Sequence, residues 1–179
     1  MKNIIIGRTY TDGVDKAFTQ LGFNVIKADY AFEDKEESQI KDYIMLFTGN
    51  HKIEYLFTID FFPNVAEVCH DMNIKYISWV WDCPHSVLWA KVARYNTNYI
   101  FLFDNDQYQM HVERGLKNVY YLPIAPDVAF FSNIISNDSG KSEKIYSNDV
   151  VFVGNFYDGE EYDIFQASFN MHLILVIVK

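Results

Sequence analysis

Short apolar runs alternate with helical patterns along most of the chain. Six runs are apolar at successive positions and have the length of buried strands: 3–7, 24–30, 55–60, 75–82, 99–104 and 118–125. Strands that are apolar on both faces and separated by single helices are typical of a parallel sheet covered on both sides. The pattern therefore predicts a doubly wound, Rossmann-like α/β domain over residues 1–127.

Between the runs, apolar residues recur at the spacing of one buried helix face. Asp12 is placed to cap the first predicted helix and Pro63 to open the third, where a first turn tolerates proline. The last predicted helix ends at Gly115. The apolar faces of the first four are Val14, Ala17, Phe18 and Leu21; Ile40, Tyr43, Ile44 and Phe47; Val65, Val68, Cys69 and Met72; and Leu88, Val92 and Tyr95.

The pattern changes after residue 127. Residues 128–148 are rich in Ser, Asn, Asp and Lys without a sustained apolar period, which indicates a linker or long loop. Residues 149–179 then show one strand–helix–strand pattern. One such unit is too small to be a stable domain, so we expect it to extend the first sheet or to begin a second domain.

Composition excludes several classes of protein. A hydrophobic content of 50% excludes disorder over most of the chain, and a formal charge of −9 argues against nucleic acid or an anionic membrane surface as a partner. No stretch approaches the roughly 20 apolar residues of a membrane span, and three isoleucines near the start are too few for a signal peptide. These features predict a cytoplasmic protein with no membrane span. Cys69 and Cys83 show neither disulfide nor zinc spacing, so no metal site is predicted.

Polar residues follow the predicted strands where each one ends. Asp82 and His85 follow the fourth strand, Asp60 the third, Asp104 the fifth and Arg8 the first. In an open parallel sheet the ligand crevice lies beyond the carboxyl ends of the strands. The sequence therefore predicts that these side chains gather at one edge of the sheet, where a carboxylate and an imidazole can reach one substrate.

Structural interpretations of the same residues stay open. Asp82 and Asp106 are each suited to cap a helix, His85 to make local hydrogen bonds, and the tryptophans to pack in a core or interface. The Asp-Asn-Asp stretch at 104–106 has the form of a metal-binding motif, but nothing nearby completes the coordination. Cys83 is expected to be inert, although a Cys83–His85 thiol hydrolase is a further alternative.

Several longer motifs together resemble a known family. "KYISWVWDCP", "NYIFLFDNDQYQMHVERGLKNVYYLPIAPD" and "DVVFVGNFY" occur in this order between residues 75 and 157. The stretch from about 55 to 157 resembles the amino-terminal part of bacterial CgeB-like spore maturation proteins, a glycosyltransferase-like family. The resemblance implies a GT-B arrangement, with an acceptor-side domain at 1–127 and the start of a donor domain at 149–157, where Gly154 and Asn155 would face the donor's phosphates.

The function implied is transfer of a sugar from a nucleotide-sugar substrate to a hydroxyl acceptor, with no other cofactor. We expect Asp82 to act as the general base with His85 as its alternative or partner, and Asp60, Asp104 and Arg8 to bind the acceptor. Only about thirty residues of the second domain are present, so the chain is expected to be inactive unless a separate partner or another copy supplies the donor domain. The alternative is a non-catalytic module that docks another protein or another copy through an aromatic surface, because the chain holds 15 Phe, 13 Tyr and 3 Trp.

Overall fold

The computed structural model describes residues 2–7, 13–28, 30–48, 52–125 and 132. The helices and strands of these residues all belong to one compact unit, Met1–Val128. The predicted linker, apart from residue 132, and the predicted strand–helix–strand pattern at 149–179 lie outside the described residues.

The unit is built on a six-stranded parallel sheet, as the alternation of apolar runs predicted. The strands are β1 (Lys2–Ile6), β2 (Phe23–Lys27), β3 (Ile53–Ile59), β4 (Lys75–Val80), β5 (Asn98–Leu102) and β6 (Val119–Tyr121). Their order across the sheet is β2-β1-β3-β4-β5-β6, and every neighbouring pair is parallel. The chain thus moves outward from β1 in one direction to reach β2, and in the other direction from β3 onward.

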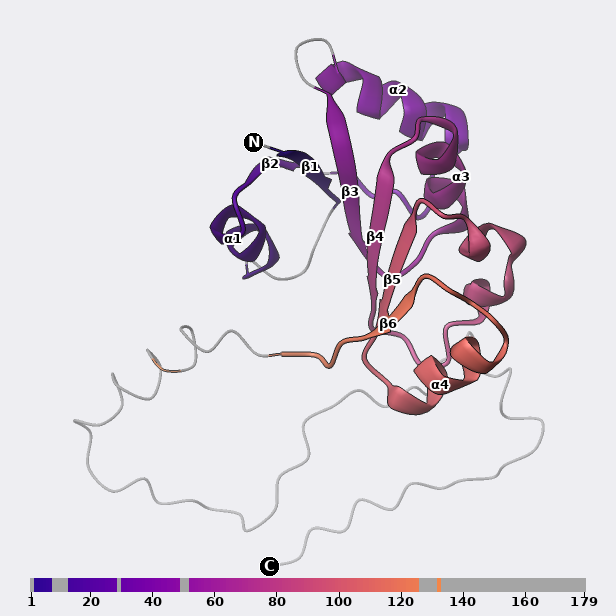
Figure 1. Ribbon diagram of the computed structural model, residues 1–179. Helices are drawn as coiled ribbons and strands as arrows, with labels where there is room; N and C mark the ends of the chain where they lie inside the picture. Colours follow the sequence, from indigo (N-terminus) through magenta and orange to yellow (C-terminus); the bar gives the residue numbers. More distant parts are fainter. Residues whose placement is uncertain (1, 8–12, 29, 49–51, 126–131, 133–179) are drawn as a thin grey trace, which may run out of the picture. The chain divides into compact units, whose positions relative to one another are not determined.

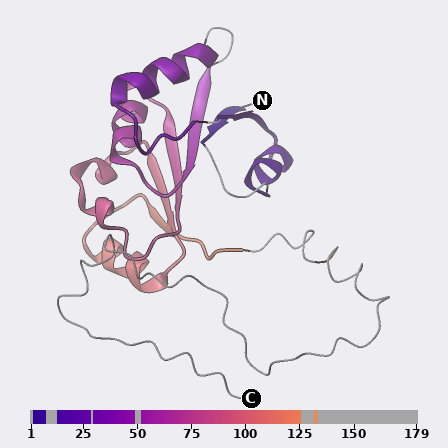
Figure 2. The ribbon, with the colours of Figure 1, turned by 180° about the vertical axis from the view of Figure 1, so that it is seen from behind.

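Helices lie on both faces of this sheet, which confirms the doubly wound prediction. Helix α1 (Gly13–Gln20) lies on one face, while α2 (Glu37–Thr48), α3 (Pro63–Asp71) and α4 (Asn105–Glu113) lie on the other (Figures 1 and 2). Pro63 opens α3 as expected. Within the described ranges, no helix combines the length and the apolar character that crossing a membrane needs.

Two cores follow from the alternation of side chains along the strands. On the α2–α4 face, Leu56, Tyr76 and Ile100 are fully buried. On the α1 face, a smaller cluster is formed by Ile4, Ile6, Phe57 and Ile59, and Val14 and Phe18 of α1 pack against it. The predicted apolar face of α1 was too wide, because Leu21 lies in the turn after the helix and is 73% exposed.

The prediction of a single helix between β4 and β5 is wrong. The segment forms two 3₁₀ turns, Ser86–Trp89 and Lys91–Arg94, separated by Ala90 in an extended conformation (φ −62°, ψ 149°). This break allows both Leu88 and Ala93 to enter the core. Residues five apart do not share a face of a regular α-helix, since 3.6 residues make one turn. Burial of both Leu88 and Ala93 therefore decides the conformation of this segment, although its apolar residues have the spacing of a helix.

Candidate functional site

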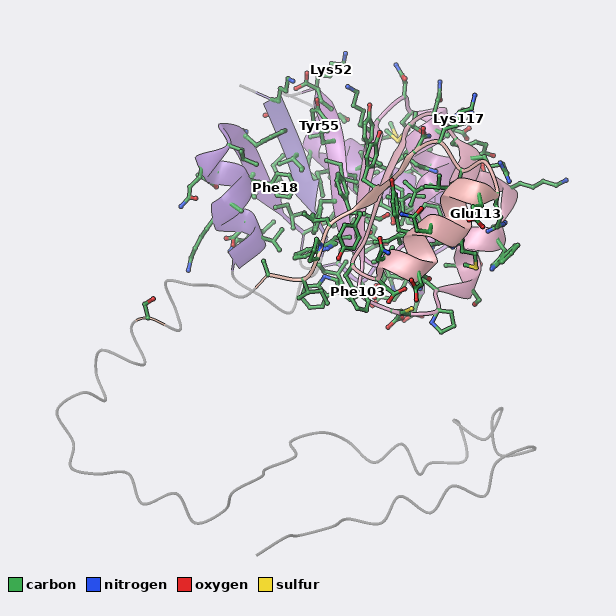
Figure 3. The ribbon with its side chains drawn as sticks, turned by 60° about the horizontal axis from the view of Figure 1, so that its bottom comes forward. Phe18, Lys52, Tyr55, Phe103, Glu113 and Lys117 are labelled. Carbon is green, nitrogen blue, oxygen red and sulfur yellow. The ribbon has the colours of Figure 1, made fainter. Side chains whose placement is uncertain are left out.

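The carboxyl ends of the parallel strands meet at one edge of the sheet, as predicted. In Figure 3, Phe103, which directly follows β5, lies at the opposite end of the sheet from Lys52 and Lys117, which precede β3 and β6. The loops after β3, β4 and β5 leave the sheet at this edge. Polar side chains on these three loops are therefore placed to act together.

Asp60 directly follows β3, and its carboxylate holds the loop after β4. Its backbone has a positive φ of 61°, a left-handed conformation that Asp tolerates better than most residues. Its Oδ1 accepts hydrogen bonds from the backbone N–H groups of Trp81 (2.7 Å) and Asp82 (3.2 Å). One carboxylate oxygen of Asp60 thus holds the loop after β4. Only the other oxygen is left for the predicted contact with an acceptor substrate.

A buried hydroxyl network supports the loop that carries Asp60. The Tyr76 hydroxyl lies 2.7 Å from Thr58 Oγ1, accepts the Phe62 amide at 3.0 Å and lies 3.4 Å from the Asp60 carbonyl oxygen. Thr58 Oγ1 also donates to that carbonyl at 2.7 Å. Tyr76 is fully buried, and burial raises the pKa of its hydroxyl, which stays protonated. The network holds the Asp60 carbonyl and the Phe62 amide, at the start of the loop after β3.

Asp82 and His85 face each other across the loop after β4. The distance from His85 Nδ1 to Asp82 Oδ2 is 3.8 Å, which exceeds a hydrogen bond. The Asp82 side chain is 72% exposed, whereas the His85 side chain is only 11% exposed. His85 Nε2 lies 3.0 Å from the Phe61 carbonyl oxygen and 3.3 Å from the Phe61 amide nitrogen. The imidazole is therefore held by its inner nitrogen and presents Nδ1 to the carboxylate.

Gln107 holds the backbone on both sides of this pair. Its Oε1 accepts the His85 amide at 2.7 Å, and its Nε2 donates to the Asp82 carbonyl oxygen at 3.3 Å. The side chain is buried in the first turn of α4. Gln107 was quoted only as part of a motif and was not predicted to have a role. The available signal was its position three residues after Asp104. Asp104 caps the helix that carries Gln107, so the cap fixes where Gln107 lies.

Asp104 is the N-cap of α4. Its Oδ1 accepts the Gln107 amide at 2.7 Å, a contact that satisfies one of the free N–H groups at a helix start. The alternative that assigned this capping role to Asp106 is wrong, because Asp106 lies within the first turn. Among the described helices and turns, none is capped by Asp82 either, since the turn after it begins at Ser86 with His85 as its N-cap residue. Asp104 thus positions the site through Gln107.

Cys83 lies between the two site residues in the sequence but is not activated. The Cys83 thiol is exposed, yet partial desolvation, the charge of Asp104 with a hydrogen bond to it, and the charge of Asp106 all raise its pKa. A raised pKa leaves less thiolate at neutral pH, and thiolate is the nucleophilic form. This environment argues against the thiol hydrolase alternative.

A small pocket of about 110 Å³ adjoins Asp60 on the side of the loop after β2. Its walls include Tyr30, Phe32 and Phe62 as well as Asp60. Pockets that enclose a whole small-molecule ligand measure roughly 300–1,000 Å³. This pocket can therefore hold only part of a ligand that extends along the edge of the sheet.

Among the predicted site residues, Asp60, Asp82 and His85 come together, with one ligand-type atom from each lying within 4.8 Å of the others. Asp104 follows β5 on the same edge and caps α4. Arg8, Gly154 and Asn155 lie outside the described residues. Comparison with known proteins found no matching family model, no matching curated protein and no matching solved structure.

Proposed function

We propose that this domain is the acceptor-side half of a GT-B-like glycosyltransferase, which transfers a sugar from a nucleotide-sugar to a hydroxyl acceptor. The observation that carries the proposal is the pairing of Asp82 and His85 at the carboxyl edge of the sheet, where ligands of open parallel sheets bind. The reaction class rests on the resemblance of the sequence motifs to those of CgeB-like proteins. The pairing supports the proposal because it offers a carboxylate that could serve as a base beside an imidazole held by the Phe61 backbone.

The exposed Asp82 carboxylate is the proposed general base. It takes the proton of the acceptor hydroxyl as the oxygen forms a bond to the anomeric carbon, while the bond from that carbon to the diphosphate breaks and the diphosphate leaves with the electron pair. His85 Nδ1 lies 3.8 Å from the carboxylate, close enough that a small shift of the exposed Asp82 side chain would let the two groups share the proton. The donor and the groups that stabilise its leaving diphosphate belong to a second domain or a partner.

The size of the pocket supports an acceptor rather than a donor role. At about 110 Å³ the pocket beside Asp60 cannot enclose a nucleotide-sugar, whose site belongs to the range of several hundred Å³. The negative carboxylates at the edge also disfavour a diphosphate. A neutral hydroxyl-bearing acceptor suits this edge better, because hydroxyl groups donate to carboxylates.

The proposal is tested by acceptor binding. Mono- and oligosaccharides are screened against the 179-residue chain by saturation-transfer NMR, and the affinity of any ligand is compared among wild type, Asp82→Asn, His85→Gln and Asp106→Asn. We expect saturable binding that weakens about tenfold or more in the first two variants, as loss of a charged hydrogen bond would cause, and that stays unchanged in Asp106→Asn. Absence of saccharide binding by the folded chain, or equal binding by all four proteins, would refute the proposal.

A second function is favoured by aromatic residues on the α1 face of β5 and β6. The Tyr120 ring stacks on Phe101 with centroids 5.3 Å apart and lies nearly parallel to Tyr99, and Tyr120 and Leu122 remain 40% and 42% exposed. Such a flat apolar surface suits contact with an identical surface on a second copy of this chain. Under this alternative, sedimentation equilibrium shows a dimer that Tyr120→Ser converts to monomer. A strictly monomeric wild-type chain at high concentration would exclude it.

A further inference from the structure

Three side chains at the carboxyl edge place metal-ligand atoms around one point. Oxygen atoms of Asp60 and Asp82 and a ring nitrogen of His85 lie within 4.8 Å of one another. The centre of three atoms at this maximum separation lies about 2.8 Å from each of them, whereas zinc bonds to oxygen and nitrogen measure about 2.0–2.2 Å. Each side chain would have to move by less than about 1 Å to bind one ion at this centre.

The orientation of His85 suits a metal ligand. The shorter contact of Nε2 is the 3.0 Å distance to the Phe61 carbonyl oxygen, to which a protonated Nε2 donates. Histidines that bind metals usually donate the proton of their other ring nitrogen to a carbonyl or carboxylate, which fixes the tautomer. This tautomer leaves a lone pair on Nδ1, and Nδ1 faces Asp82. Because the His85 side chain is largely buried, the ring is already oriented.

Asp60 and Asp82 differ in rigidity in a way that suits an accessible metal site. Asp60 is held by the hydrogen bonds that Oδ1 accepts from the backbone after β4, and within the described part of the chain its Oδ2 makes no hydrogen bond. Asp82 is 72% exposed, so its carboxylate can rotate toward the centre. Two fixed ligands and one adjustable ligand on the solvent side leave room for water or substrate on the ion.

The charges of the cluster also favour a cation. Two carboxylates and an imidazole lone pair repel one another at these distances unless a positive group lies between them. Over the residues that the structure describes, no lysine or arginine forms an ion pair with Asp60 or Asp82. A cation at the centre would supply the missing positive charge.

We propose that Asp60, Asp82 and His85 bind a divalent transition metal ion of the Zn²⁺ or Mn²⁺ type, with the remaining coordination positions open to solvent. The imidazole ligand distinguishes this site from those of Mg²⁺ and Ca²⁺, which prefer oxygen ligands alone. Three protein ligands with an open position are the arrangement of catalytic metal sites. The inference stands on the geometry of the three side chains and does not require the proposed sugar transfer.

If the domain does bind a hydroxyl acceptor, which rests on the proposed function, the ion would act on that hydroxyl directly. A hydroxyl or water bound to Zn²⁺ loses its proton far more easily than in bulk solvent. Asp82 and His85 would then act as ligands, and the bound ion would promote deprotonation of the acceptor.

The test uses the metal-free 179-residue chain without saccharide. Zn²⁺ is titrated by calorimetry, and Co²⁺ is added as a spectroscopic probe whose visible absorption reports its coordination. We expect one saturable Zn²⁺ site per chain and a visible Co²⁺ absorption band typical of an ion with few ligands. Asp82→Asn, His85→Gln and Asp60→Asn should each weaken Zn²⁺ binding at least about tenfold, because changes around a metal of this kind commonly cost 10- to 100-fold in affinity.

The controls separate this site from other ligands. Asp60→Asn keeps an oxygen acceptor for the two amides and tolerates the left-handed backbone, so it removes charge without removing the anchor. Asp106→Asn and Cys83→Ser should leave Zn²⁺ affinity unchanged.

Lack of saturable Zn²⁺ and Mn²⁺ binding, equal affinity for Mg²⁺, loss of binding in Cys83→Ser, or unchanged affinity in both Asp82→Asn and His85→Gln would overturn the inference. If Asp60→Asn fails to fold, the other two variants decide. Because saccharide binding is measured separately, failure of the metal site leaves the proposed function standing.

Discussion

Replacement of Tyr76 by Phe removes one hydroxyl from beneath the candidate site. That hydroxyl accepts the amide of Phe62 at 3.0 Å and lies 2.7 Å from Thr58 Oγ1. Phe62 is the N-cap residue of α3 and makes no side-chain cap hydrogen bond. In the variant, therefore, the Phe62 amide loses the partner that Tyr76 supplied, while Thr58 keeps its bond to the Asp60 carbonyl oxygen.

The expected loss of stability follows from these contacts. A hydrogen bond contributes about 1 kcal/mol net, and a donor left without a partner costs a further amount that reaches about 1–3 kcal/mol when the donor is fully buried; the Phe62 amide is partly buried. Phenylalanine retains the ring, so the packing of the fully buried side chain is kept and no large cavity forms. We expect the free energy of unfolding to fall by about 2 kcal/mol, which corresponds to a decrease in Tm of about 5–10 °C for a unit of this size.

The assay is urea and thermal unfolding followed by circular dichroism. Tyr99→Phe is the matched control, because Tyr99 lies on the neighbouring strand and, within the described residues, its hydroxyl makes no hydrogen bond. The control should change the free energy of unfolding by less than about 0.5 kcal/mol. A Tyr76→Phe variant as stable as Tyr99→Phe would refute the argument that the buried network supports the loop.

Three further substitutions test other parts of the argument. Gln107→Ala removes both hydrogen bonds to the loop after β4 and should lower the free energy of unfolding by about 2–3 kcal/mol, whereas Gln109→Ala, exposed on the same helix, should have little effect in the same urea titration. Gly7→Ala would place a Cβ 3.0 Å from a Phe32 ring carbon, and this overpacking should cost about 1–3 kcal/mol; a variant of wild-type stability would contradict it. The raised pKa of Cys83 predicts alkylation at pH 8 slower than that of a free cysteine peptide, and an equal or faster rate would contradict the thiol's assigned environment.

The sequence was sufficient to predict the architecture because apolar pattern and topology are tightly linked in parallel α/β folds. Strands buried on both faces leave a strong signal, and all six were identified within a few residues of their ends. The segment between β4 and β5 was not predictable by the same means. Its apolar residues have the spacing of a helix, but Leu88 and Ala93 are both buried in the core. Which residues are buried depends on the neighbouring elements, which the local pattern does not contain.

The candidate site was predictable in its chemistry but not in its support. Position after a strand was enough to bring Asp60, Asp82 and His85 to one edge, because the carboxyl ends of parallel strands share that edge. The long-range contacts that hold them join residues 14 to 25 positions apart, such as the Tyr76 hydroxyl with the Phe62 amide and the Gln107 side chain with the Asp82 carbonyl. No local pattern encodes these contacts.

The side chains that hold the site in place bind its backbone and not its ligand-type side chains. Substitutions can therefore change the chemistry and the geometry of the site separately. Gln107 holds the backbone of Asp82 and His85, and the Asp60 carboxylate holds the Asp82 amide. Asp82→Asn therefore changes the charge at the edge of the sheet and keeps these backbone contacts. Gln107→Ala keeps every ligand-type side chain but removes the contacts that hold the loop after β4. If ligand or metal affinity depends on preorganisation, both substitutions weaken it, but only Gln107→Ala also lowers the free energy of unfolding by the amount given above. If the loop orders itself around its ligand, Gln107→Ala reduces stability alone and affinity is retained.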